Sequence, residues 1–314
     1  MSAASGPNAG FSRATNHHTT TDRRCLTMTT STSAQRPGWL RRAFAVSSTK
    51  QLRPLKRWRI LTALIAVPLA LSACGLSTGH AAGELGANQA LLATCPKDMR
   101  LATKVDIDVS GSDRTSTLDV QRLSAVEDQT RRTAVCGGHL QVTAFSATSA
   151  ATAVLYDGEI TLAGATDNAR LRQVPATVKQ ITSEVAQAYT AKIGSLTPGG
   201  SDIAGQYRLA SEYLAQLGSG YRLDLVLLTD GFQTAGFTIG NTPLDPAAAA
   251  ALADKVAVPK LPAASITVAG IGQVASQPPS SAVVSGVVAF YNALCHQTGA
   301  AQCTSVTDYT PTGR

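Results

Sequence analysis

Residues 104–112 read Lys-Val-Asp-Ile-Asp-Val-Ser-Gly-Ser, an apolar strand pattern that runs into a polar turn. Apolar, β-branched residues at every second position predict a strand over Lys104–Val109. Two later segments have a related form. Residues 199–202 read Gly-Gly-Ser-Asp ahead of a helical pattern, and residues 228–231 read Leu-Thr-Asp-Gly at the end of an apolar run. All three segments therefore lie where open α/β sheets place binding sites, at strand ends and helix starts.

Strand and helix patterns alternate along the chain around these segments. Leu223–Leu228 is nearly all apolar, as expected of a central strand covered on both faces. The strands predicted at 139–145 and 152–156 are joined too tightly to be parallel. The other predicted elements are helices over 116–133, 175–188, 203–217 and 284–294, an alanine-rich helix after Asp245-Pro246, and strands over 265–271 and 303–307. We expect a doubly wound α/β fold, with a mostly parallel six-stranded sheet, one antiparallel strand and helices on both faces.

The three polar segments together supply five hard oxygen ligands, which are Asp108, Ser110, Ser112, Ser201 and Asp230. Two carboxylates and three hydroxyls do not suit zinc, which prefers nitrogen and sulfur. They suit Mg²⁺ or Mn²⁺, and also Ca²⁺, because these ions bind oxygen. The sequence therefore predicts a divalent-cation site formed by the three segments.

Residues 108–112, Asp-Val-Ser-Gly-Ser, resemble the DxSxS signature of the von Willebrand factor type A (vWA) domain. Residues 199–205 resemble the second element of that family, which usually has threonine where this chain has Ser201. Residues 227–231 resemble its third element. The segments occur in the family's order, and the resemblance covers roughly Lys104 to the C-terminus.

The vWA resemblance implies a metal-ion-dependent adhesion site and no catalytic residue. Ser110 and Ser112 would bind the metal through their hydroxyls, while Asp108 and Asp230 would act mainly through bound water. Ser201 would take the threonine position, without the β-branch that restricts χ1. A carboxylate from a partner protein completes such a site. The resemblance therefore implies a binding protein, not an enzyme, whose partner has an exposed acidic residue.

The loop after Asp230 carries two aromatic residues, Phe232 and Phe237. Exposed aromatic side chains near a polar anchor favour interfaces, so we expect both to help select the partner. The alternative is that they pack under the sheet.

Two other interpretations remain open. Asp106-Ile107-Asp108-Val109-Ser110 approximates the DxDx(T/V) opening of haloacid-dehalogenase-like phosphatases, in which the first aspartate is the nucleophile. Leu227-Leu228-Thr229 approximates the second motif of those Mg²⁺-dependent enzymes. They also need a late acidic pair, and no Asp or Glu lies between Asp254 and Asp308. The other interpretation is a metal-free structural module of the cell envelope.

The N-terminal region has the pattern of a bacterial lipoprotein signal. Basic residues at 53–59 precede an apolar run at 60–71 that is too short for a comfortable membrane span. Residues 71–75, Leu-Ser-Ala-Cys-Gly, resemble a lipoprotein box, which implies that Cys74 carries lipid. We expect a leader outside the fold over 1–52, a signal peptide over 53–73, a tether over 74–94 and a vWA-like domain over 95–314. The protein is then exported and anchored to the outer face of the bacterial cytoplasmic membrane.

Removing the signal region reverses the sign of the net charge. Eleven of the 27 Lys and Arg residues lie before Cys74, but only Asp22 of the 20 Asp and Glu residues does. Residues 74–314 therefore carry about three net negative charges. Nucleic-acid-binding proteins show a basic stripe, so we expect no nucleic-acid partner.

Four cysteines follow Cys74, namely Cys95, Cys136, Cys295 and Cys303. An even number in an exported protein predicts two disulfides. Three connectivities are possible. Closeness in sequence favours Cys295–Cys303, which leaves Cys95–Cys136.

Overall fold

The computed structural model describes residues 83–111, 115–148, 150–196 and 199–310. The predicted leader, the signal peptide and the lipidation site Cys74 lie outside these ranges. So does Ser112, one of the five predicted cation ligands.

A six-stranded sheet forms the centre of the domain, in the order β3-β2-β1-β4-β5-β6. The strands are β1 (Arg100–Asp108), β2 (Gly138–Phe145), β3 (Thr152–Ile160), β4 (Tyr221–Leu228), β5 (Ser265–Ala269) and β6 (Gln302–Val306). All neighbours pair in parallel except β2 and β3, which pair antiparallel. The predicted fold class is confirmed, including the single antiparallel strand, which is four residues longer than the sequence pattern indicated.

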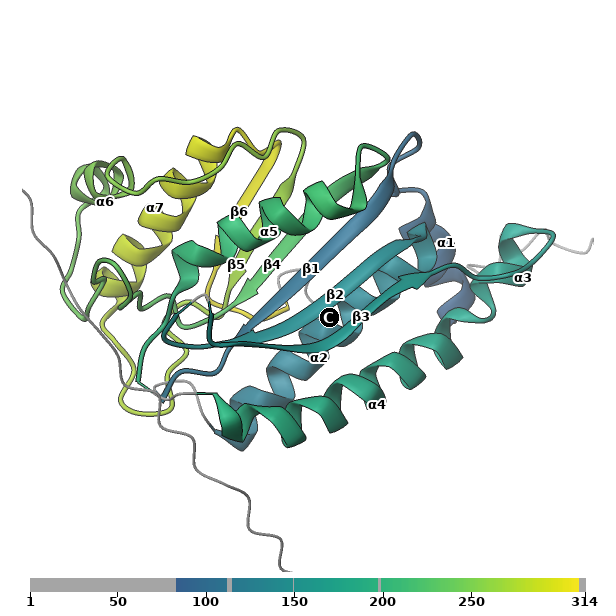
Figure 1. Ribbon diagram of the computed structural model, residues 1–314, viewed down its shortest axis with the longest axis horizontal. Helices are drawn as coiled ribbons and strands as arrows, with labels where there is room; N and C mark the ends of the chain where they lie inside the picture. Colours follow the sequence, from purple (N-terminus) through teal and green to yellow (C-terminus); the bar gives the residue numbers. More distant parts are fainter. Residues whose placement is uncertain (1–82, 112–114, 149, 197–198, 311–314) are drawn as a thin grey trace, which may run out of the picture. The chain divides into compact units, whose positions relative to one another are not determined.

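Helices cover both faces of the sheet (Figure 1). One face carries α2 (Ser116–Cys136) and α4 (Val174–Lys192), with the short helices α1 (Glu84–Leu92) and α3 (Asp167–Leu171) at its end. The other face carries α5 (Ile203–Leu217), α6 (Pro246–Ala253) and α7 (Ser281–Thr298). None of the helices in the described ranges is long and apolar enough to cross a membrane.

Side-chain alternation along the strands divides the interior into two cores. Val105, Ile107 and Val226 point into a first core with α2 and α4. Leu225 and Leu227 point into a second core with α5 and α7. Both faces of β1 and β4 are therefore buried, and their apolar side chains are divided between the two cores.

Part of the segment predicted as a tether over 74–94 is helical in the structure. Residues 84–92 form helix α1, and Leu85, Leu91 and Leu92 pack against the first core. Glu84 also forms an ion pair with Arg131 of α2, with 2.9 Å between its Oε1 and the arginine Nη1. The described part of the folded domain therefore includes residues 84–92, which precede Cys95.

Two disulfides form, with the pairing that closeness in sequence favoured. Cys95 pairs with Cys136 at the end of α2, and Cys295 of α7 pairs with Cys303 of β6. The first bond closes a long loop around β1 and α2, and the second fastens the edge strand β6 to the helix that covers it.

Candidate functional site

The candidate site lies where the winding of the sheet reverses direction. Strands β2 and β3 lie on one side of β1, whereas β4, β5 and β6 lie on the other. In open α/β sheets a crevice forms beyond the carboxyl ends of the two strands at this point. Asp108 is the last residue of β1, and Thr229 and Asp230 directly follow β4. The fold thus brings together two segments that are 121 residues apart.

The carboxylate of Asp108 is the centre of a buried hydrogen-bond network. Its Oδ1 accepts from the backbone N–H of Ser110 at 2.9 Å. Its Oδ2 accepts from the hydroxyls of Ser201 at 2.8 Å and Thr229 at 2.7 Å. The Ser110 hydroxyl also interacts with it. Residues from all three predicted segments therefore converge on one carboxylate, which is fully buried.

Burial raises the pKa of the Asp108 carboxyl above its ordinary value, and the surrounding hydrogen bonds lower it only in part. Desolvation disfavours the charged form, whereas hydroxyl and amide donors favour it. In the absence of a cation, the site therefore holds a carboxylate whose negative charge is incompletely stabilised. A positive ion beside Asp108 would relieve this cost.

Asp230, with Gly231 and Tyr291 behind it, forms the second wall of the site. Asp230 is fully buried, and its Oδ1 accepts from the backbone N–H of Phe232 at 2.9 Å. Gly231 has a positive φ of 85°, and a Cβ there would lie 2.7 Å from Val287 of α7, so only glycine fits. The Gly231 carbonyl accepts from the hydroxyl of Tyr291 at 3.0 Å. Asp108 and Asp230 both contribute to raising the pKa of Tyr291, after its burial.

The Ser201 loop is held by a segment that sequence reasoning missed. Thr234 Oγ1 accepts from the backbone N–H of Ser201 at 2.8 Å, and the N–H of Thr234 donates to the Ser201 carbonyl at 3.0 Å. Gln233 Oε1 accepts from the N–H groups of Ile203 at 2.8 Å and Ala204 at 3.0 Å. Both N–H groups belong to the first turn of α5, where backbone donors have no partner within the helix. The loop after β4 therefore fixes both Ser201 and the start of α5.

Thr229 is the other residue that the five-ligand prediction left out. Its hydroxyl donates to Asp108 and accepts from the N–H of Gly231 at 3.0 Å. The signal for it was its place directly before Asp230, at the end of an apolar strand. It is as close to Asp108 as any of the predicted ligands.

Asp106 does not belong to this cluster. It lies two residues before the end of β1, is fully buried and accepts from Lys104 Nζ at 2.7 Å and from the Thr143 hydroxyl. Lys104 also donates to Gln141 at 3.0 Å. The pair is thus an internal ion pair within the sheet.

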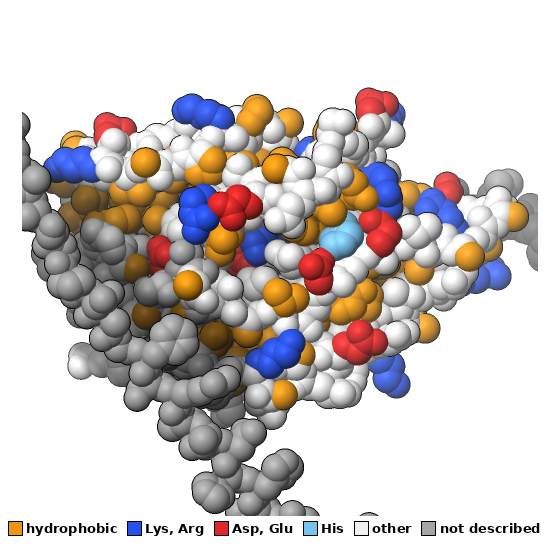
Figure 2. Space-filling model, viewed as in Figure 1, with side chains coloured by type: hydrophobic (Ala, Val, Ile, Leu, Met, Phe, Trp, Pro, Cys, Tyr) orange, Lys and Arg blue, Asp and Glu red, His pale blue; other side chains and the backbone are white. Residues whose placement is uncertain are grey.

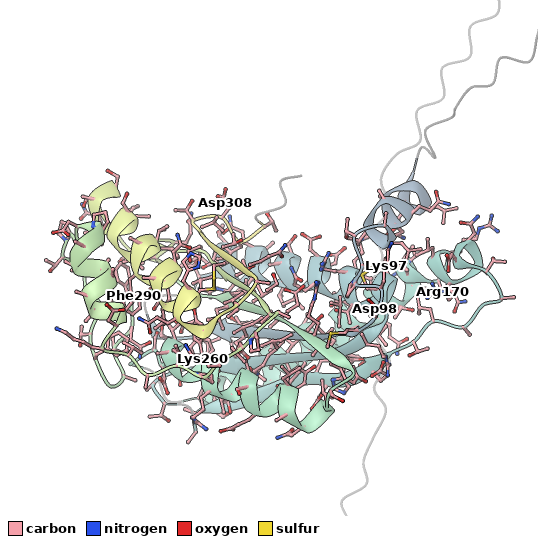
Figure 3. All side chains as sticks on the ribbon, turned by 90° about the horizontal axis from the view of Figure 1, so that it is seen from above. Lys97, Asp98, Arg170, Lys260, Phe290 and Asp308 are labelled. Carbon is pink, nitrogen blue, oxygen red and sulfur yellow. A yellow bond between two sulfur atoms is a disulfide. The ribbon has the colours of Figure 1, made fainter. Side chains whose placement is uncertain are left out.

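The two loop phenylalanines are half-buried and pack against the second core. The Phe237 ring lies 5.7 Å from the ring of Phe290 in α7 (Phe290 is labelled in Figure 3). Each retains part of its surface, so their predicted contribution to partner selection stays a prediction.

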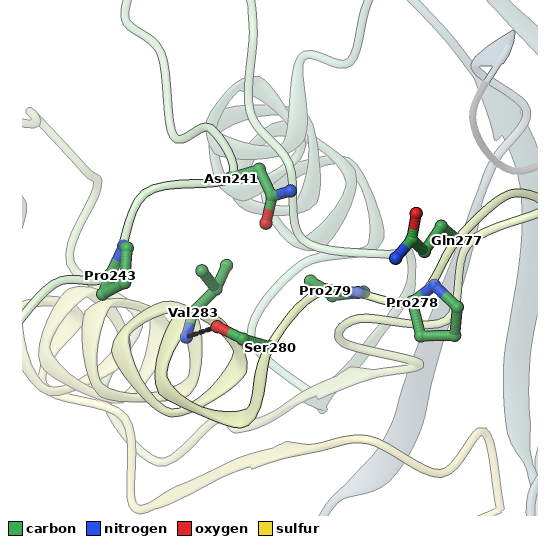
Figure 4. A pocket seen from close by; sticks show the side chains of 7 residues that line it. All are labelled: Asn241, Pro243, Gln277, Pro278, Pro279, Ser280 and Val283. Carbon is green, nitrogen blue, oxygen red and sulfur yellow. Dashed lines mark hydrogen bonds between the residues drawn. The ribbon is translucent and has the colours of Figure 1, made fainter.

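A neutral hollow lies at the same edge of the sheet, between the loop after β4 and the loop that leads into α7 (Figure 4). Its volume is about 530 Å³, and its lining residues are Asn241, Pro243, Gln277, Pro278, Pro279, Ser280 and Val283. Ser280 caps α7 by accepting from the N–H of Val283 at 3.4 Å. No charged side chain lines the hollow.

The chemistry of the described donors fits a hard cation. Asp108, Asp230, Ser110 and Ser201 offer carboxylate and hydroxyl oxygens, the ligands that Mg²⁺ and Mn²⁺ prefer. No group of three or more His, Cys, Asp or Glu side chains in the described ranges could hold a metal ion. A cation here would consequently depend on the serine hydroxyls as well as on the two carboxylates.

No protein-family model matches the sequence, and no curated protein matches it either. Similar solved structures include proximal thread matrix protein 1 from the mussel byssus, at 14% identity over 67% of this chain and 44% of that chain, with a TM-score of 0.33. They also include the pilus adhesin SpaC from Lactobacillus rhamnosus GG, at 13% identity over 68% of this chain and 28% of that chain, with a TM-score of 0.36. A von Willebrand factor type A protein from Catenulispora acidiphila matches at 11% identity over 62% of this chain and 43% of that chain, with a TM-score of 0.27. The chain covers less than half of each of these proteins, and the fold class rests on its own strand order.

Proposed function

We propose that this protein is an extracytoplasmic binding module that uses a divalent cation at Asp108 to hold an acidic group of a partner protein. The observation that carries the proposal is the convergence of the Ser201 and Thr229 hydroxyls on the Asp108 carboxylate, at 2.8 and 2.7 Å. Asp108, Ser110, Ser201 and Asp230 would hold Mg²⁺ or Mn²⁺, together with Ser112. The cation would supply a coordination position for a carboxylate ligand.

The hydrogen bonds around Asp108 support a role in cation binding. Each serine or threonine hydroxyl that now donates to Asp108 can turn an oxygen lone pair toward a cation, because a hydroxyl both donates and accepts. The raised pKa of Asp108 has the same implication, since a cation would stabilise its charged form.

The position of Asp106 argues against the phosphatase alternative. That mechanism needs Asp106 as an accessible nucleophile, but its side chain is fully buried and bound to Lys104. Thr229, which would belong to the second phosphatase motif, donates to Asp108 instead. The geometry favours cation binding over phosphoryl transfer.

The surface charge supports a protein partner rather than a nucleic acid. On the face that carries α5, acidic and basic side chains are intermixed, without a basic stripe (Figure 2). The two disulfides suit an oxidising compartment outside the cytoplasm. We accordingly keep Cys74 as the proposed lipid anchor, which would hold the domain at the outer face of the cytoplasmic membrane.

Calorimetric titration of Mg²⁺ and Mn²⁺ into the full-length protein tests the cation site. We expect saturable binding that is lost in Asp108→Ala and Asp230→Ala and kept in the surface control Asp308→Ala. Circular dichroism shows whether each variant is folded. If the folded wild type binds neither ion, the proposal is wrong and the metal-free structural module is the better interpretation.

A partner is then sought by pull-down with Mg²⁺ and with a chelator. Capture that needs both the cation and Asp108 supports the proposal. Capture that is unchanged in chelator, or in Asp108→Ala, contradicts the role of the cation in partner binding.

A further inference from the structure

A polar groove of about 340 Å³ lies on the side of the sheet that carries α2, over strands β4, β5 and β6. The second core places α7 on the opposite side of β5 and β6. Among the described elements, α2 covers β1 and β2 on the groove side and leaves β5 and β6 open. The groove therefore exists because β6 extends the sheet beyond the reach of α2.

The strand register arranges the floor of this groove in two rows. Asp224, Ser265 and Gln302 form the first row, and Val226, Thr267 and Thr304 form the second. Neighbouring strands lie about 4.8 Å apart, so adjacent members of a row can contact one ligand. The four residues on β5 and β6 are all neutral and polar, and those on the edge strand β6 are exposed.

Ser265, Thr267, Gln302 and Thr304 make no side-chain hydrogen bond to any other described residue. Gln129 of α2 also lines the groove, and its Oε1 is buried without a partner. A buried polar atom such as Gln129 Oε1 is usually paired with protein, water or ligand, and the more exposed groups beside it are open to water or a ligand. The groove thus presents hydrogen-bonding groups that the fold itself does not use.

The ionic groups of the lining neutralise each other. Arg132 Nε lies 3.1 Å from Asp224 Oδ2, and Asp224 is only 5% exposed. Arg222 lies two residues before Asp224 on the same face of β4 but does not line the groove. A phosphate or a metal ion would therefore find no uncompensated charge of the opposite sign in the lining.

We propose that this groove binds a neutral saccharide. Hydroxyls and amides both donate and accept hydrogen bonds, as do the hydroxyls of a sugar. A sugar ring can pair with Thr267, Thr304 and Gln302 at once, whereas an apolar ligand would leave these groups unpaired.

Two apolar side chains complete the groove. Val226 lies in its floor, and Tyr309 forms a wall, held by a hydrogen bond from Arg122 Nη2 to its hydroxyl at 3.2 Å. Gly270 is required beside this wall, because a Cβ there would lie 2.2 Å from the Tyr309 ring. A few polar groups beside apolar walls are typical of small-molecule sites, and the C–H face of a sugar suits such a wall.

The groove and the candidate cation site are separate. The rows 224–265–302 and 226–267–304 lie in the amino-terminal and middle parts of their strands, whereas Asp108 and Asp230 lie at the carboxyl ends. The saccharide proposal therefore does not rest on the cation proposal, and either can fail alone.

Amide NMR spectra of the ¹⁵N-labelled full-length protein test the proposal. The probes are cellobiose, maltose and N,N′-diacetylchitobiose, with glucuronate and inorganic phosphate as charged controls. We expect at least one disaccharide to shift the amides of Ser265, Thr267, Gln302 and Thr304. The double variant Thr267→Val/Thr304→Val should weaken binding about tenfold or more, because two hydrogen bonds are lost. Thr152→Val on β3 is the matched control and should bind like the wild type.

Valine keeps the shape and strand preference of threonine, so the variants should fold, which thermal unfolding checks. No shift with any disaccharide would overturn the proposal, as would shifts only with phosphate or glucuronate. Shifts that persist in the folded double variant, or that map to another surface, would also overturn it. Retention on insoluble cell-wall polysaccharide, lost in the double variant, would identify a wall polymer as the source. Binding of soluble disaccharides without such retention would identify a free sugar.

Discussion

Asp108 is fully buried and accepts hydrogen bonds from Ser110, Ser201 and Thr229, yet its pKa is still raised. Hydrogen bonds to a charged group recover only part of the hydration that burial removes. The residue is therefore kept in an unfavourable state unless a positive charge binds beside it. Residues in this state are often functional.

We predict that Asp108→Asn stabilises the metal-free protein at neutral pH. Because the folded pKa lies above the unfolded one, the carboxyl binds its proton more tightly in the folded state. Its contribution to stability is full below the unfolded value near 3.8 and is lost as pH rises through the folded pKa. Asparagine removes this loss, so the thermal midpoint in chelator at pH 7 should rise by a few degrees, the shift that about 1 kcal/mol produces.

Thermal scans of the wild type and the variant between pH 3 and pH 7 measure the effect. Adding Mg²⁺ should raise the midpoint of the wild type only. A variant that is less stable than the wild type at pH 7 in chelator, and equally stabilised by Mg²⁺, would contradict this view of Asp108.

Three sequence motifs predicted Asp108, Ser110, Ser201 and Asp230 as cation ligands. The structure brings the first three into direct contact. The motifs did not predict Gln233 or Thr234. Their side chains act on Ser201 and on the first turn of α5 only because the loop after β4 folds back over both. That loop path is set by tertiary packing, which no local motif encodes.

At the level of elements, helix α5 begins with a cap supplied from elsewhere in the chain. Asp202 accepts from Gly205 N–H at 3.1 Å, and Gln233 accepts from Ile203 and Ala204. Gln233→Ala removes two of these bonds, so we predict a loss of about 1–2 kcal/mol in the free energy of unfolding. Urea unfolding measures it, and Gln180→Ala on the exposed side of α4 is the control, expected to change stability by less than about 0.5 kcal/mol.

The same variant should weaken Mg²⁺ binding, because it loosens the first turn of α5, which begins two residues after Ser201. If Gln233→Ala loses stability but binds Mg²⁺ as tightly as the wild type, then the loop after β4 does not position the site.

The two disulfides should differ in their effect on stability. Cys95–Cys136 spans 41 residues, and Cys295–Cys303 spans 8. In the loop-entropy model the longer bond contributes about 4 kcal/mol and the shorter about 2.5 kcal/mol. We predict that replacing both cysteines of the first pair by alanine lowers the free energy of unfolding more than the same change in the second pair. Equal losses, or the opposite order, would show that local packing outweighs loop closure.

Most helices and strands could be predicted from the periodicity of apolar residues in the sequence, because β1, β4 and α5 each bury a regular apolar pattern. Helix α1 did not, since residues 84–92 carry glycine, alanine and polar residues without an apolar stripe. Its position depends on the Glu84–Arg131 ion pair and on leucines that contact a core formed by distant elements. Such long-range support is invisible in a local sequence window.

For the whole molecule, several tyrosines are buried in the two cores and should govern its behaviour at high pH. Burial raises the pKa of Tyr207, Tyr213 and Tyr291, and burial together with Asp119 raises that of Tyr189. Each stays protonated in the folded state above pH 10, where the unfolded chain releases its proton. The stability that these tyrosines contribute below their pKa in the unfolded chain is therefore lost as the pH rises past 10.

We predict that these tyrosines ionise only when the protein unfolds. Absorbance at 295 nm should rise together with the loss of circular dichroism in an alkaline titration. A rise near pH 10 in a protein that is still folded, larger than the other three of the seven tyrosines can give, would show that the buried tyrosines are accessible.

The domain separates its candidate sites over one sheet. The carboxyl edge between β1 and β4 carries the oxygen cluster around Asp108, and the open face of β5 and β6 carries the neutral groove. Because the two candidate sites are separate, a ligand at one of them would leave the other open.

The proposed function depends on a divalent cation that binds among Asp108, Ser110, Ser201 and Asp230. An anomalous difference map from crystals of the protein grown with Mn²⁺ would locate this ion. We expect one strong peak within coordination distance of the Ser110 and Ser201 hydroxyls, beside the two carboxylates, and no such peak in Asp108→Ala crystals. An empty site at saturating Mn²⁺, or a peak held by other residues, would contradict the proposed function.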